Sequence, residues 1–145
     1  MMNRMKDFFK GLTQFNTFGL LTLRVLPAYY MIVNHGWKKI INPERWEKLG
    51  NALTKYFGDI LDFANPFFGF LASAGETVCA LMVLIVLFTQ PAALVTAGTM
   101  FFAAMHHITT TGSPESAWIY FSIFMAIAML GPGKYSIDEM ILKKK

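Results

Sequence analysis

The stretch Pro66–Phe88, PFFGFLASAGETVCALMVLIVLF, decides the fold, because its 23 residues contain a single charged side chain, that of Glu76. A membrane-spanning helix needs about 20 predominantly apolar residues. Helices on the surface of a soluble protein show a polar stripe at helical spacing, whereas this stretch is apolar on all sides. The sequence therefore predicts that residues 66–88 form a helix that crosses a membrane.

Three further apolar stretches accompany it, at residues 17–36, 91–109 and 115–131. The first is long enough to span a bilayer, and the last two reach across it with the help of flanking Thr, Gly and Pro residues. Together the four stretches predict an all-α fold, an integral membrane four-helix bundle in a single domain covering residues 1–145. A soluble helical core is disfavoured, because all-round apolarity is typical of membrane spans or of very large cores.

The first loop is predicted to hold a short amphipathic helix. Asn42-Pro43 is a turn signal, and residues 43–57 follow it with apolar and charged side chains on opposite faces. The apolar face carries Trp46, Leu49, Leu53 and Phe57, and the polar face carries Glu44, Glu47, Lys48 and Lys55. We expect this interfacial helix to rest on the outer membrane surface or to cap the mouth of the bundle.

The distribution of basic residues predicts the orientation. The net charge of +4 reflects cations in the two tails and the first loop, so nucleic acid is not expected as a partner. With four spans, both tails and the turn between the second and third helices share one side, which carries seven Lys and Arg residues against five on the other. The positive-inside rule then favours cytoplasmic termini in the inner (plasma) membrane, with the lipid bilayer as the main partner.

Arg24 and Glu76 are the only charges within their apolar stretches, and charged residues inside a membrane usually pair, line a cavity or carry function. At 1.5 Å per residue, Arg24 lies about 16 Å below the face reached by His35, and Glu76 lies about 15 Å below the face reached by Pro66. We therefore expect Arg24 and Glu76 to pair. The pair is predicted either to form the floor of a polar cavity or only to fix the helix register.

Histidines lie near the same face of the predicted bundle. His35 ends the first helix, His106 and His107 end the third, and Glu115 begins the fourth. These groups predict a polar funnel above the two charges, in which Arg24, His35, Glu76, His106, His107 and Glu115 bind a substrate and Glu76, Arg24 and His106 act on it. The spacing matches no strong metal-ligand motif, so no metal site is predicted. A site for a metal at the histidines and Glu115, or for a haem between His35 and His106, is a weaker alternative.

The order of these motifs is that of a known family. Leu23-Arg24-Val25 is followed by Asn34-His35-Gly36-Trp37-Lys38-Lys39, then by Gly75-Glu76, and finally by residues 131–138, GPGKYSID. In this order the chain resembles the DoxX family of small four-helix membrane proteins over essentially its whole length. It differs from the shortest members in its longer first loop.

The resemblance implies a function in membrane redox systems. Relatives act as subunits of a thiosulfate:quinone oxidoreductase or associate with oxidative-stress or quinone-detoxification systems. The leading hypothesis is therefore a subunit of a quinone-linked membrane redox system, whose pocket holds a quinone or a small sulfur anion beside Arg24. Whether the chain itself is an enzyme stays open, because Cys79 is its only cysteine and no flavin motif is present. No covalently bound cofactor is expected, so a bound quinone or a protein partner would carry the electrons.

Two other function classes compete with this one. A non-enzymatic scaffold or assembly subunit would hold a partner through the first-loop helix and the tails. A small-molecule transporter would require a homo-oligomer, because four spans without an inverted repeat do not make a typical monomeric carrier.

Overall fold

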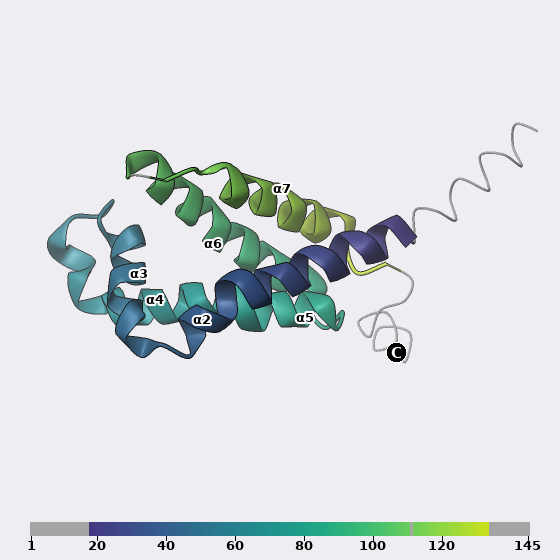
Figure 1. The fold of residues 1–145 in the computed structure, drawn as a ribbon, viewed down its shortest axis with the longest axis horizontal. Helices are drawn as coiled ribbons and strands as arrows, with labels where there is room; N and C mark the ends of the chain where they lie inside the picture. The colour runs from purple at the N-terminus through teal and green to yellow at the C-terminus, as the bar shows by residue number, and fades with distance from the viewer. Residues whose placement is uncertain (1–17, 111, 134–145) are drawn as a thin grey trace, which may run out of the picture.

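The computed structural model describes residues 18–110 and 112–133, and its elements are helices and turns, with no strand among the described residues. The first helix covers residues 18–40 (Figure 1). It is α-helical over residues 18–30, widens into the π-helical turn η1 (Met31–Gly36), and finishes as α2 (Trp37–Ile40). The two basic tails and the last part of the GPGKYSID motif lie outside the described residues.

The predicted first-loop helix is confirmed, as η2 (Pro43–Arg45) followed by α3 (Trp46–Thr54). It packs lengthwise along the start of the second long helix, because glycines on both partners allow the two backbones to approach closely. A side chain on Gly50 would overlap the backbone of Asn65, and one on Gly69 would overlap the backbone of Trp46. Thr54 Oγ1 also donates a hydrogen bond to Asn65 Oδ1 at 2.5 Å.

The second long helix begins earlier and ends earlier than residues 66–88. It consists of η3 (Asp59–Ala64), α4 (Asn65–Ala74), the π-helical turn η4 (Gly75–Cys79) and α5 (Ala80–Leu84). The chain then turns through residues 85–88, where Val86 and Phe88 have positive φ angles of 60° and 46°.

The third and fourth helices match the predicted boundaries closely. They are α6 (Thr89–Thr109) and α7 (Glu115–Leu130). Thr89, Gln90 and Pro91 form the first turn of α6 and not a separate loop, since proline is tolerated in a first helical turn. Gly131-Pro132-Gly133 follows α7, and Gly131 caps its end with a positive φ angle of 79°.

The long helical segments alternate in direction. Gln90 Nε2, at the start of α6, donates a hydrogen bond to the Ala128 carbonyl near the end of α7 at 3.1 Å. Lys55 Nζ, after α3, donates to Thr109 Oγ1 at the opposite end of α6, at 2.8 Å. The core lies between the helices and is built mainly of alanines and a few larger side chains, namely Ala28, Met31, Ala80, Val83, Ala93, Ala97, Met100, Phe124 and Ile127.

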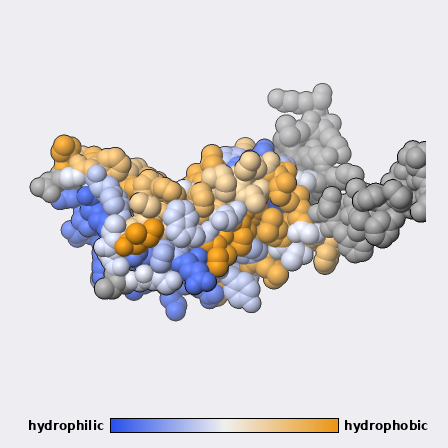
Figure 2. All heavy atoms as spheres, turned by 90° about the horizontal axis from the view of Figure 1, so that it is seen from above, coloured by the Kyte–Doolittle hydropathy of each residue, from blue (hydrophilic) through white to orange (hydrophobic). Residues whose placement is uncertain are grey.

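Two helices of the described residues are long and apolar enough to cross a membrane, Ile60–Leu84 and Thr89–Thr109. The apolar helix α7 is shorter, with 16 residues. Large apolar side chains are exposed along the helices, and Figure 2 shows them over much of one face, with hydrophilic residues concentrated toward the end that carries α3. Such a surface suits contact with lipid.

Candidate functional site

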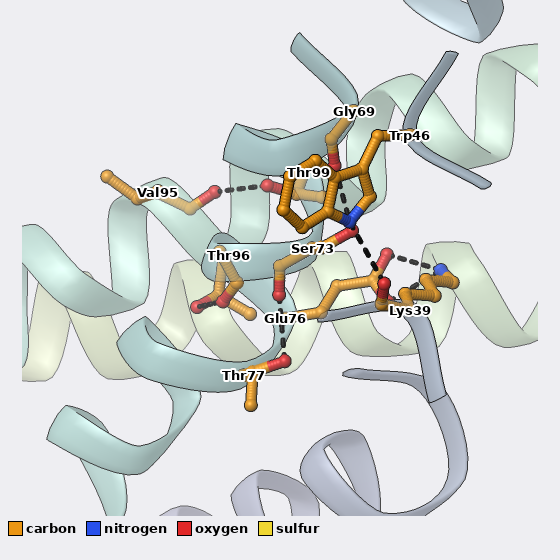
Figure 3. A network of polar contacts seen from close by, with 10 residues as sticks. Lys39, Trp46, Gly69, Ser73, Glu76, Thr77, Val95, Thr96 and Thr99 are labelled. Atoms are coloured by element: carbon orange, nitrogen blue, oxygen red, sulfur yellow. Dashed lines mark hydrogen bonds and ion pairs between the residues drawn. The ribbon is translucent and has the colours of Figure 1, made fainter. Parts of the chain in front are cut away.

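A buried ion pair joins the first and second helices. Lys39 Nζ lies 2.7 Å from Glu76 Oε1 and 2.6 Å from Glu76 Oε2, so the ammonium group contacts both carboxylate oxygens (Figure 3). The Glu76 side chain is 2% exposed and the Lys39 side chain 24% exposed. The carboxylate is therefore sealed inside the helices, while the lysine reaches it from a partly open side.

Both members of the pair belong to, or follow, a π-helical turn. Glu76 is part of η4, and Lys39 lies three residues after the last residue of η1, Gly36. The two turns pack against each other, and a side chain on Gly36 would come within 2.5 Å of the Glu76 carbonyl oxygen and of Thr77 Oγ1. Single π-helical turns are rare and occur frequently at functional sites. Two of them in contact around a buried charge mark this region as the candidate site.

Hydrogen bonds from side chains to carbonyls fix the backbone on either side of Glu76. Ser73 Oγ donates to the Gly69 carbonyl and Thr77 Oγ1 to the Ser73 carbonyl, both at 2.8 Å (Figure 3). From α6, Thr96 Oγ1 donates to the Gly75 carbonyl at 2.9 Å. Because these groups are held on two helices, the carboxylate sits in a rigid frame.

The ion pair lies level with the middle of α6. Thr96 and Thr99 face Gly75, and Thr99 is about 15 Å along the axis from each end of α6 at 1.5 Å per residue. Glu76 thus lies level with the centre of α6, a helix that is long enough to cross a membrane.

Aromatic groups surround the lysine and the neighbouring histidine. Trp46 Nε1 donates a hydrogen bond to the Lys39 carbonyl at 3.0 Å and so ties α3 to the end of the first helix. The ring of His35 meets the ring of Tyr120 edge-on, with centroids 5.5 Å apart. His35 also interacts electrostatically with both Glu76 and Lys39. His35 therefore lies within electrostatic range of the ion pair and packs against Tyr120 of α7.

The predicted Arg24–Glu76 pair is wrong. Arg24 is buried, but its guanidinium donates to the Pro132 carbonyl and, through Nε, to the Leu20 carbonyl at 3.1 Å. The depth estimate took the start of the second helix and the end of the first to be level. They are not, because α3 packs beside the first turns of α4 and the first helix ends opposite Glu76. Arg24 consequently lies at the far end of the bundle, where it binds the chain leaving α7.

The remaining candidate residues lie near the end of α6 and at the start of α7. His106 and His107 have ring centroids 6.0 Å apart, and the charges acting on His106 are those of His107, Lys48 and Lys55. Glu115 lines a shallow hollow on α7 with Trp118, Ile119, Ser122 and Ile123. Among the described residues, no three His, Cys, Asp or Glu side chains are close enough together to hold a metal ion.

Lys39 is the functional candidate that sequence reasoning missed. Its place beside Trp37 near the end of the first span is typical of an interfacial anchor, because lysines at the end of a span commonly reach the membrane surface. One signal could have identified it. Lys39 follows His35 by four residues, so the two side chains lie on the same face of the first helix.

Comparison with known proteins supports a family for this chain. The family model DoxX matches residues 19–109, which is more than half of the chain and includes both Lys39 and Glu76. The searches of curated proteins and of solved structures found no match to this chain.

Proposed function

This chain belongs to the DoxX family of small membrane proteins, and we propose that it is a membrane subunit of a quinone-linked redox system of the bacterial inner membrane. The observation that carries the proposal is the buried Lys39–Glu76 pair, with His35 beside it, at the contact of two π-helical turns. Ionisable residues buried at mid-depth in a membrane are costly and are usually retained for function.

The proposal places the chain in the membrane as a four-helix bundle. The first helix and α7 would cross together with the two helices that meet the length and hydropathy criteria. At 16 residues α7 is about 24 Å long, somewhat less than the roughly 30 Å hydrocarbon core, and the residues flanking it would complete the crossing. The alternating directions bring the start of the first helix and the end of α7 to one side, and the basic residues in the sequence of the two tails favour that side as the cytoplasmic one.

The ion pair has the groups needed to bind a quinone ring. A lysine ammonium has three donors, and the two carboxylate oxygens of Glu76 engage two of them. No described residue accepts a hydrogen bond from the third, which can donate to a quinone carbonyl oxygen through the partly exposed side of Lys39. The ring of Tyr120, which packs edge-on against His35, offers an apolar surface for the rest of the molecule.

Reduction of a quinone to a quinol consumes two electrons and two protons. In this proposal the electrons come from a partner protein. Glu76 and His35 carry the protons to the ring oxygens, since a carboxylate and an imidazole are common proton-transfer groups. The protein itself contributes binding, orientation and proton delivery.

Binding of a short-chain ubiquinone or menaquinone analogue to the protein in lipid nanodiscs tests the proposal. We expect Lys39→Gln to weaken binding by about tenfold or more, because a hydrogen bond from a charged donor contributes about 1.5–3 kcal/mol. The matched control is Lys38→Gln, since Lys38 is exposed on the same turn. We expect that control to change affinity by less than about twofold. Equal affinity of the two variants would refute the quinone site.

A scaffold is the second candidate, because the same pair clamps the first helix to the second. In that function the charges have no ligand, and an apolar pair of similar volume should serve equally well. Lys39→Met with Glu76→Leu distinguishes the two. If the double variant keeps full quinone-dependent activity in its native membrane, the pair is a clamp; if it is stable but inactive, the pair belongs to a ligand site.

A further inference from the structure

A second group of charged side chains lies at the end of the molecule that carries α3. We call it the α3–α6 cationic cluster, and it consists of Lys48, Lys55, His106 and His107. Lys48 and Lys55 are seven residues apart, so they project from the same side of the first-loop helix and the turn that follows it. Both act electrostatically on His106, near the end of α6. The cluster is thus assembled from two elements that are distant in sequence.

The cluster carries more positive charge than its surroundings neutralise. Among the side chains that the structure describes, the only salt bridge is Lys39–Glu76, so neither Lys48 nor Lys55 is paired with a carboxylate. The end of α6 offers a partial negative charge of about −0.5, which is smaller than the two full charges of the lysines. Glu44 and Glu47 share the polar face of the first-loop helix, but neither forms a salt bridge with Lys48 or Lys55 among the described residues, so a positively charged site remains at this end of α6.

Local contacts hold the cluster in place. Lys55 Nζ donates to Thr109 Oγ1 at 2.8 Å and lies 5.0 Å from the centre of the Tyr56 ring, whose hydroxyl group also meets Thr109 Oγ1 at 3.1 Å. Nδ1 of His106 is buried and has no hydrogen-bond partner among the described residues. A buried polar atom without a partner is unusual in a folded protein and calls for an explanation such as an absent ligand.

The apolar surroundings indicate what kind of anion fits. Phe57 lies two residues after Lys55 and Ile108 directly follows His107, and each of these apolar side chains is 55% exposed. Cations beside exposed apolar side chains, at the end of a helix long enough to cross a membrane, match a phospholipid, whose phosphate group and acyl chains need both. We infer that the α3–α6 cationic cluster binds the phosphate of an anionic membrane phospholipid. This inference is independent of the quinone site.

Native mass spectrometry of the full chain in detergent tests the inference by titration with phosphatidylglycerol and, separately, with phosphatidylcholine. We expect the protein to prefer phosphatidylglycerol, because the choline group of phosphatidylcholine cancels the phosphate charge. Lysine-to-glutamine replacement should weaken phosphatidylglycerol binding about fivefold per lysine, or roughly 25-fold for Lys48→Gln with Lys55→Gln. The matched control Lys38→Gln should leave the affinity unchanged within about twofold.

Three results decide the outcome. Equal affinity for the two lipids, or a preference that survives the double variant, would overturn the inference. Displacement of phosphatidylglycerol by millimolar inorganic phosphate would also overturn it, because the site would then bind a free oxyanion. If the double variant does not fold, Lys48→Gln alone is decisive, since Lys48 is exposed and makes no hydrogen bond among the described residues. Lys48→Arg, which keeps the charge, should retain binding.

Discussion

Replacement of Lys39 by methionine should be the most destabilising conservative change at the candidate site. Methionine retains most of the side-chain volume but removes the ammonium group, so Glu76 is left 2% exposed and without its cation. The two charge-assisted hydrogen bonds of 2.6 and 2.7 Å are lost at the same time.

The magnitude follows from the burial of each partner. Breaking a buried ion pair by removing one member costs about 3–5 kcal/mol. Because Lys39 is 24% exposed, we place Lys39→Met near the lower limit, at about 3 kcal/mol of unfolding free energy. Glu76→Leu should cost less, about 1–2 kcal/mol, since the lysine left behind can reach water. The double variant should return to within about 1 kcal/mol of the natural protein, because an apolar pair needs no counter-charge.

Unfolding in mixed detergent micelles, followed by circular dichroism, measures all four proteins of this double-mutant cycle. The cycle should give a coupling energy of about 3–5 kcal/mol between positions 39 and 76, because the double variant recovers most of the cost of the two single variants. Lys38→Met provides the control and should change stability by less than about 0.5 kcal/mol. The reasoning fails if Lys39→Met is no more harmful than this control, or if the double variant is as unstable as Lys39→Met alone.

Three other substitutions have distinct expected outcomes. Gly36→Ala should destabilise the protein by about 1–3 kcal/mol in the same unfolding assay, because its new methyl group meets the facing π-helical turn at 2.5 Å; Gly19→Ala, with open space around it, should not. Arg24→Gln should lower stability by about 1.5–3 kcal/mol while quinone affinity stays unchanged, and a loss of affinity equal to that of Lys39→Gln would contradict the separation of the two charges. Trp46→Phe should cost about 1 kcal/mol through loss of the indole hydrogen bond, and proteolysis of the first loop should become faster; equal cleavage rates would argue against this tie.

The helices could be predicted from sequence because each depends on local composition. Apolar runs, an Asn-Pro turn signal and a Gly-Pro-Gly stop lie within the segments that they determine, so α3, α6 and α7 were located within a few residues. The π-helical turns could not be predicted, since nothing in the composition of residues 31–36 or 75–79 distinguishes a π-helical turn from an α-helical one.

Partner choice across the helices was the harder problem. The sequence identified Glu76 as a buried charge but assigned it Arg24, because the relative height of two helices depends on how the intervening loop packs. Here α3 lies along α4, and the first helix is therefore shifted by several turns relative to the second. As a result Lys39, and not Arg24, lies opposite Glu76. That packing depends on close backbone contact at Gly50 and Gly69, a tertiary property that single-sequence patterns do not reveal.

The Lys39–Glu76 pair also has a consequence for the order of synthesis. Glu76 follows Lys39 by 37 residues, so a ribosome that adds 5–20 residues per second makes the acid about 2–7 s after its base. The helix that carries Glu76 is therefore made after the helix that carries Lys39, its counter-ion. A carboxylate that would be costly to insert alone thus has its cation available in the preceding helix, as part of a hairpin of two successive segments.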